Sequence, residues 1–291
     1  TTRDSVNPGD PLEFCVSSAS PDYTIDLYRL GWYDGVGARK VHSIGGTNGS
    51  QQSVPEPETD EMLVRCDWPV TDAVTVPSEW TTGLYYAIFR SGGEATACPF
   101  VVREETPSAK MLVQLPFNTQ QAYNNWGGYS FYDFNSDDDE YHKLVSYNRP
   151  YANPYAMHLG YAIHFIRWAE REGYSMAYAT NLDMMRYPDT LQDYTLVTCV
   201  GHDEYPPPAQ YDAYKNARDT GTNLMFLGGN LWTTQTPFRE SDRVIIKNGG
   251  WEEARIIGLE FGPGTSLWKF PDLEVVDPSH RWFEGSGFEK G

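Results

Sequence analysis

The first third of the chain alternates short apolar or aromatic segments with clusters of Gly, Pro, Asn and Ser. This alternation, interrupted by turn residues at short intervals, is typical of the strands of an antiparallel sandwich. The segments that we expect to form strands are Leu12–Ser17, Tyr23–Leu30, Met62–Trp68, Gly83–Phe89 and Ala97–Arg103. The pattern therefore predicts an all-β domain over residues 1–105, in which Gly83–Phe89 resembles a central strand of an immunoglobulin-like β-sandwich.

A different pattern begins near Lys110, where short apolar runs alternate with stretches of helical periodicity. Between His158 and Glu172 apolar residues recur every three or four positions, and Gly173 then ends the pattern as a C-cap. Strands that alternate with helices predict βαβ units and a parallel sheet. The expected strands are Met111–Leu115, Ser175–Ala179, Leu196–Val200 and Asn223–Leu227, and the expected helices are His158–Glu172 and Tyr211–Asp219. Residues 106–291 are therefore predicted to form a mainly parallel α/β domain.

The predicted strand Leu196–Val200 ends abruptly in Gly201-His202-Asp203-Glu204-Tyr205. Because open parallel sheets bind ligands beyond the carboxyl ends of their strands, we expect His202 and Glu204 in a functional site. Asp203 would point to the opposite side if the strand continues, since successive side chains alternate. A solvated loop is the simpler alternative, in which Glu204 is only a carboxylate near the start of a helix.

Two further strand ends carry residues that could join this site. Tyr123 follows the first predicted strand of the second domain, and Asn230 follows Asn223–Leu227. Such strand ends converge on one edge of a parallel sheet, and Tyr151 could reach the same edge from a loop. The chain has 20 tyrosines, however, and most tyrosines serve packing. His202 could likewise be a core histidine, and Asn230 could simply cap a turn.

Composition narrows the possible partners. The 291 residues include 40 acidic and 22 basic side chains, for a net charge of −18, which would repel the phosphates of a nucleic acid. No apolar run is long enough to cross a bilayer, so we expect a soluble protein without membrane contacts. The four cysteines lack the spacing of a zinc site. They leave the compartment open, and we favour the cytoplasm over secretion.

Beyond single positions, motifs spread in order along nearly the whole chain resemble those of the N,N-dimethylformamidase large (beta) subunit family. The matching stretches are Tyr28–Tyr33, Ala122–Gly128, Arg149–Tyr151, Glu172–Tyr174, Gly201–Tyr205, Asn223-Leu224 and Gly229-Asn230. The resemblance implies a β-sandwich followed by an α/β domain of glutamine-amidotransferase-like type. It also implies a domain that continues past Gly291, so we expect 106–291 to be incomplete at its C-terminus. A small subunit and further copies of the chain are the expected protein partners.

The resemblance also implies a mononuclear ferric iron held by two tyrosinates and one glutamate. Carried over by motif, the glutamate is Glu204 and the tyrosines are Tyr123 and Tyr151. The other tyrosines that compete for these two roles are Tyr129, Tyr132 and Tyr147. The family also has a histidine and an asparagine near the metal, which match His202 and Asn230. Phenolate and carboxylate oxygens are hard anionic ligands, so this set suits ferric iron.

The expected activity is hydrolysis of the C–N bond of a small amide. The metal would act as a Lewis acid, His202 would carry protons, and Asn230 would orient the substrate or stabilise an oxyanion. Pro206-Pro207-Pro208 stands where the family usually has Trp, which puts the substrate range in doubt. The alternative is a non-catalytic module that binds carbohydrate or a partner on an inactive amidotransferase-like scaffold. A glutamine amidotransferase is disfavoured, because Cys199 lies inside a strand rather than on a nucleophile elbow.

Overall fold

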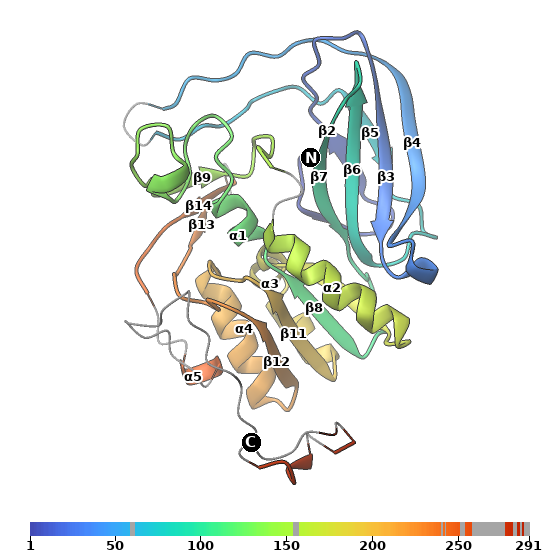
Figure 1. The fold of residues 1–291 in the computed structure, drawn as a ribbon, viewed down its shortest axis with the longest axis vertical. Helices are drawn as coiled ribbons and strands as arrows, with labels where there is room; N and C mark the ends of the chain where they lie inside the picture. Colours follow the sequence, from blue (N-terminus) through green and yellow to red (C-terminus); the bar gives the residue numbers. More distant parts are fainter. Residues whose placement is uncertain are drawn as a thin grey trace. The chain divides into compact units, whose positions relative to one another are not determined.

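The computed structural model describes residues 1–58, 62–153, 157–239, 241, 243–250, 254–257, 277–281, 284, 285 and 287. The chain divides into two compact units, Thr1–Leu259 and Glu260–Gly291. All the helices and strands below belong to the first unit, and Figure 1 shows how they follow one another. Much of the C-terminal part of the predicted domain 106–291 lies outside the described residues. None of the described helices has the length and apolar character that a membrane span requires.

The N-terminal region builds a five-stranded sheet with the strand order β1-β7-β6-β3-β4. Along β3 buried residues alternate with more exposed ones, as expected for a strand that packs one face on a core. The pairings among β3, β4, β6 and β7 are antiparallel, whereas β1 pairs parallel with β7. The strands are β1 Ser5–Val6, β3 Asp22–Leu30, β4 Ala38–Asn48, β6 Gly83–Ser91 and β7 Glu94–Val102.

A second, two-stranded antiparallel sheet consists of β2 (Pro11–Phe14) and β5 (Asp72–Thr75). Leu12 and Phe14 of β2 share one buried cluster with Leu27, Tyr85 and Phe100 of the larger sheet. The two sheets of the N-terminal region therefore enclose a common core, as a sandwich requires.

One expectation for this region was wrong, and one strand was missed. Met62–Trp68 is not a strand, because Leu63 forms only an isolated bridge with Glu58 and the Cys66 N–H donates to the carbonyl of Asn148 at 2.6 Å. Strand β4 was not expected at all. Its Gly45-Gly46 pair resembles a turn, but two register shifts let the strand follow β3 as far as Asn48.

The second region contains a four-stranded sheet in the order β10-β8-β11-β12, and every pairing in it is parallel. All five residues of β8 and all five of β10 are buried, which is typical of strands covered on both faces. This sheet confirms the predicted parallel arrangement. Its strands are β8 Met111–Leu115, β10 Met176–Thr180, β11 Leu196–Gly201 and β12 Asn223–Gly228.

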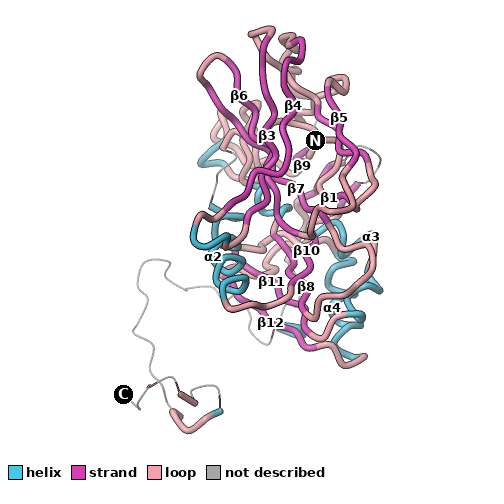
Figure 2. The backbone as a smooth tube through the Cα atoms, turned by 90° about the vertical axis from the view of Figure 1, so that its right-hand side faces the viewer, coloured by secondary structure: helices cyan, strands magenta, loops and turns pink. Residues whose placement is uncertain are grey.

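Helices cover both faces of the parallel sheet, with α2 (Met157–Arg171) on one side and α3 (Asn181–Arg186) and α4 (Pro208–Asp219) on the other, as Figure 2 shows. Ile166 of α2 belongs to the same buried cluster as Val113 and Val200. Tyr214 of α4 belongs to another cluster with Val197, because neighbouring residues of a strand face opposite sides. The carboxyl ends of β8, β11 and β12 consequently meet at one edge, between these helical layers.

The remaining elements are short, and no periodic pattern predicts them. An antiparallel sheet in the order β13-β14-β9 lies in the second region. Helix α1 is a single buried segment after β8. The bounds are α1 Phe117–Ala122, β9 Leu144–Ser146, β13 Phe238–Arg239, β14 Val244–Ile246 and α5 Ala254–Ile257, with 3₁₀ turns η1 Tyr33–Gly35, η2 Asp133–Asn135 and η3 Pro188–Asp193.

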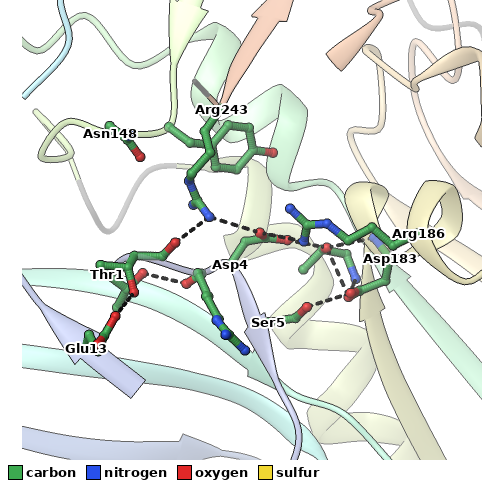
Figure 3. A network of polar contacts seen from close by, with 12 residues as sticks. Thr1, Asp4, Ser5, Glu13, Asn148, Asp183, Arg186 and Arg243 are labelled. Carbon is green, nitrogen blue, oxygen red and sulfur yellow. Dashed lines mark hydrogen bonds and ion pairs between the residues drawn. The ribbon is translucent and has the colours of Figure 1, made fainter. Parts of the chain in front are cut away.

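The chain passes from the first region to the second between β7 and β8, and buried polar contacts cross this boundary (Figure 3). The Ser5 hydroxyl donates to Asp183 at 2.5 Å, and Arg186 forms an ion pair with Asp4 at 3.0 Å. Burial opposes ionisation of Asp4, yet Arg186 and Arg243 bring the pKa of its carboxyl below the usual value. The division into domains 1–105 and 106–291 stays a prediction, since these contacts bind the two regions together.

Candidate functional site

Strand β11 ends in a turn that only glycine accommodates. Gly201 has a φ of +92°, in the left-handed region that favours glycine. Its carbonyl oxygen lies so close to Gly228 of β12 that a side chain at Gly228 would collide with it. This close approach of the two strand ends directs His202 and Glu204 to one side of the turn and Asp203 to the other.

Glu204 is the centre of the candidate site. Three groups approach its Oε2 atom: the Tyr132 hydroxyl donates to it at 2.7 Å, the Tyr123 hydroxyl donates at 3.2 Å, and His202 Nε2 lies 3.1 Å away. The Thr233 hydroxyl lies 3.4 Å from the second oxygen, Oε1. Two phenols, a carboxylate and an imidazole therefore meet at one point.

The two phenols come from one continuous segment. Tyr123 is the C-cap of α1, so the buried helix fixes its position after β8. Tyr132 returns to it across a loop in which Phe131 donates its N–H to the carbonyl of Ala122 at 3.0 Å. The rings of Tyr123 and Tyr132 lie with their centroids 4.1 Å apart, and the Tyr205 hydroxyl donates to that of Tyr132 at 2.6 Å.

Helix α1 also holds the backbone that carries Glu204. The N–H of Glu204 donates to the Thr119 hydroxyl at 2.9 Å, and the Asn118 side chain donates to the carbonyl of Tyr205 at 2.8 Å. Both residues are buried. One short helix thus positions the tyrosine segment and the glutamate segment relative to each other.

The charges of the cluster follow from burial and from these hydrogen bonds. Burial raises the pKa of Glu204, but the hydrogen bonds from His202, Tyr132 and Tyr123 outweigh burial and bring the pKa of the carboxyl below its usual value. Burial and the negative charge of Glu204 raise the pKa of both Tyr123 and Tyr132 above the usual tyrosine value. Without a metal ion, the Glu204 cluster therefore consists of one carboxylate that accepts hydrogen bonds from two neutral phenols.

Lys247 supplies a positive charge beside the cluster. Its Nζ donates to the carbonyl of Phe131 at 2.9 Å and lies 5.2 Å from the centroid of the Tyr132 ring. Burial lowers the pKa of Lys247, while Glu204 and Asp133 oppose that shift. Lys247 and Thr233 were not predicted, because both lie in irregular segments where the sequence carries no periodic signal.

A cavity of about 450 Å³ opens beside His202. Backbone of the glycines at the ends of β11 and β12 forms part of its wall, and apolar side chains from α2 and β12 form the rest. The lining residues are Tyr161, Phe165, Val200, Gly201, His202, Leu227, Gly228 and Gly229. Asn230 follows this wall directly and has a left-handed backbone, with a φ of +49°.

The structure thus brings Tyr123, His202 and Glu204 together, with Asn230 just after the adjoining strand; their roles stay a prediction. Tyr151 lies elsewhere. It is buried in the wall of a cavity of about 690 Å³, lined also by Cys98 and Arg243. Burial raises the pKa of the Tyr151 phenol well above its usual value.

Of the other tyrosines that could be metal ligands, one lies at Glu204 and two lie elsewhere. Tyr132 contacts Glu204, whereas the Tyr147 hydroxyl donates to Asn118 at 2.5 Å and Tyr129 packs against the ring of His142. Among the described residues no three His, Cys, Asp or Glu side chains are grouped to hold a metal. The possible metal ligands around Glu204 differ from such groups, because two of the three, Tyr123 and Tyr132, are phenols.

The thiols give no sign of nucleophilic chemistry. Cys199 is completely buried in β11, and burial together with the nearby Asp203 raises the pKa of its thiol well above the usual value. All four cysteines are free. A buried thiol with a raised pKa is a poor nucleophile, so this environment also disfavours Cys199 as the nucleophile of an amidotransferase.

Comparison with known proteins gives one result that bears on function. A search of curated proteins finds no match. A family model described as N,N-dimethylformamidase beta subunit-like, C-terminal, matches residues 24–291. The match includes the whole four-stranded parallel sheet and every residue of the Glu204 cluster. The chain belongs to the N,N-dimethylformamidase beta subunit-like family.

Proposed function

We propose that the protein hydrolyses the C–N bond of a small amide at the Glu204 cluster. The family suggests a hydrolase of amides. The observation that carries the proposal is the convergence of Tyr123, Tyr132 and His202 on one carboxylate oxygen of Glu204, beside a cavity lined by His202. Convergent polar groups next to a partly apolar cavity are typical of catalytic sites.

The donor set fits a mononuclear ferric iron. Tyr123, Tyr132 and Glu204 would hold it, since phenolate and carboxylate oxygens are hard anionic ligands. Both phenols have raised pKa values because they are buried beside a carboxylate, and a highly charged cation would reverse that effect. When bound, the ion would supply Lewis acidity to the reaction. In this proposal Tyr132 takes the role that motif matching assigned to Tyr151.

The protein's own residues would handle the proton and the substrate. His202 accepts a proton from the attacking water and returns it to the amine nitrogen as the C–N bond breaks, leaving a carboxylic acid and an amine. Asn230, at the end of β12, orients the amide or donates to its carbonyl oxygen. Leu227 and Phe165 line the cavity with apolar surface that suits short alkyl groups on the amide.

Three finer features belong to the same proposal. The first region is taken as an immunoglobulin-like sandwich, because its two sheets share one core. The second is taken as glutamine-amidotransferase-like, because a parallel sheet lies between helices. The family description names a beta subunit, so we infer that the chain works with a small subunit and assembles with further copies of itself.

The test is expression with supplemented iron, followed by metal analysis and by assay of amine release from short formamides and other small amides. A small subunit, where one accompanies the chain, is included. The proposal expects about one iron per chain and turnover of at least one amide. Iron-free protein that hydrolyses none of the panel would contradict it and leave a non-catalytic binding module as the better account.

A further inference from the structure

Asp203 lies between His202 and Glu204 in sequence but points away from both. Its side chain is completely buried, on the face of β11 that packs on α4. Four groups donate to its carboxylate: the Asn181 amide at 2.7 Å, the Trp232 indole at 2.9 Å, the Gln210 amide at 3.0 Å and the Cys199 thiol at 3.3 Å. A carboxylate held this fully is fixed in direction.

The donors to Asp203 come from separate elements. Asn181 begins α3, Gln210 lies in the first turn of α4, and Trp232 follows β12. All are neutral, and among the described ion pairs none includes Asp203. Burying a carboxylate without a cation is costly, and only a complete set of hydrogen bonds offsets that cost. Simple packing of the sheet on α4 would be served better by an apolar residue.

The network returns to the site at both ends. The Asn181 side-chain oxygen accepts from the N–H of Asn118 at 2.9 Å, and the Asn118 amide holds the carbonyl of Tyr205. On the other side Trp232 binds Asp203 twice, since its backbone N–H also donates to the Asp203 carbonyl at 2.8 Å. Trp232 is fully buried and has a φ of +57°.

Trp232 lies in the loop that carries two residues of the site. Asn230 precedes it by two positions, and Thr233, next in sequence, contacts Glu204. Thr234 then donates its N–H to the carbonyl of Glu204 at 3.1 Å. The loop after β12 therefore runs beside the His202–Tyr205 turn, and the Asp203 side chain joins the two through the Trp232 indole.

We propose that Asp203 is a positioning residue, which holds the His202–Glu204 turn and the Asn230–Thr233 loop in one fixed relation through Trp232. The inference rests on the proposed function for the meaning of the site, but the coupling between turn and loop is a property of the chain itself. A purely structural carboxylate would stabilise the fold without controlling the relation between these two segments.

The experiment compares Asp203→Asn with wild type. Asparagine keeps the size but turns one acceptor oxygen into a donor that faces the Trp232 or Asn181 N–H. In the iron-loaded protein we expect the visible tyrosinate-to-iron band to shift and kcat to fall by about 10- to 100-fold, the usual effect of removing a group that orients a metal site, with little change in KM. In the iron-free protein we expect hydrogen exchange at Trp232 and Thr234 to rise at least about tenfold, with β8 unchanged.

Three variants keep the test decisive. Trp232→Phe removes the indole donor, together with some ring volume, but keeps the Asp203 carboxylate, and it should reproduce the exchange effect even if Asp203→Asn folds poorly. Cys199→Ala removes the weakest donor and should leave the band in place. Asp4→Asn makes the same substitution at a buried carboxylate outside the site and should lower stability only.

The outcomes distinguish a failure of the positioning role of Asp203 from a failure of the proposed function. The positioning role is wrong if Asp203→Asn and Trp232→Phe lower thermal stability without changing three measurements. These are the hydrogen exchange of the loop, the visible absorption band and kcat. If wild type takes up no iron and hydrolyses no amide, the proposed function fails, and the exchange measurement alone still decides whether Asp203 couples the turn to the loop.

Discussion

Two cavities differ in what surrounds them: Tyr151 lines one, and the other lies beside His202, where we propose that the chemistry takes place. The cavity around Tyr151 is larger, about 690 Å³ against 450 Å³, and it holds a buried phenol, thiols and two arginines. Its polar groups do not converge on a common partner in the way that Tyr123, Tyr132 and His202 converge on Glu204. Arg149, for example, donates to backbone carbonyls of Trp126 and Tyr129. We therefore base the proposed function on the convergence of donors at Glu204 rather than on cavity volume.

The largest effect is expected at the centre of the smaller site. Glu204→Gln keeps the size of the side chain but removes the only carboxylate among the three oxygen donors. Iron content and amide turnover should both fall to background, because one of the three anionic oxygen ligands is replaced by a neutral amide that binds ferric iron more weakly. Metal analysis of the purified variant beside wild type measures this, and a variant that retains stoichiometric iron would remove Glu204 from the metal site.

His202 should behave differently from Glu204. His202→Ala removes a proton carrier and no oxygen donor, so the variant should keep most of its iron while kcat falls by about two to four orders of magnitude. Steady-state kinetics with iron-loaded protein provide the measurement. A loss of iron as complete as that of Glu204→Gln would make His202 a metal ligand instead.

The first region should respond in stability rather than in chemistry. Asp4 forms a buried ion pair with Arg186 and accepts from the Thr180 hydroxyl at 2.7 Å. Asp4→Asn removes the charge from this buried ion pair and should lower the free energy of unfolding by roughly 3 kcal/mol. Urea unfolding measures the loss. Unchanged stability, or a loss of iron in folded protein, would contradict the structural role assigned to this contact.

A smaller effect is expected from acid. In the folded protein the pKa of Glu204 lies below its usual value of 4.5. The hydrogen bonds to the Glu204 carboxylate therefore stabilise the folded protein above pH 4.5, and this stabilisation is lost as the pH falls through the lowered pKa. Unfolding of iron-free protein between about pH 3 and pH 6 should show this loss in wild type and less of it in Glu204→Gln. Identical pH profiles would mean that the hydrogen bonds from the tyrosines and His202 do not favour the ionised carboxylate.

The parts of the molecule that could be predicted from the sequence are those with a periodic apolar pattern or with a polar motif directly after a predicted strand. Strand β8 is a buried apolar run, and helix α2 has a regular apolar spacing. Because parallel strands end at one edge, Tyr123, His202 and Glu204 could be assigned to one site. The choice between Tyr132 and Tyr151 could not be made, because both lie in irregular segments whose course depends on individual contacts.

Those contacts are visible only in three dimensions. The loop between Tyr123 and Tyr132 is held by the Asn135 amide, which donates to the Tyr123 carbonyl at 3.1 Å, and by Ser130, which donates its hydroxyl to Asn135. Lys247 reaches the site from the end of β14 by pairing of short strands. Neither arrangement follows from spacing along the chain.

The most direct test of the central claim compares Tyr132, which contacts Glu204, with Tyr151, which lines the larger cavity. Iron-loaded Tyr132→Phe and Tyr151→Phe are measured beside wild type for the visible charge-transfer absorption of tyrosinate bound to ferric iron. Each substitution removes one hydroxyl and keeps the ring, so packing changes little. The account predicts that Tyr132→Phe shifts or weakens the band while Tyr151→Phe leaves it unchanged. A band lost in Tyr151→Phe and intact in Tyr132→Phe would contradict it and return the second ligand to the larger cavity.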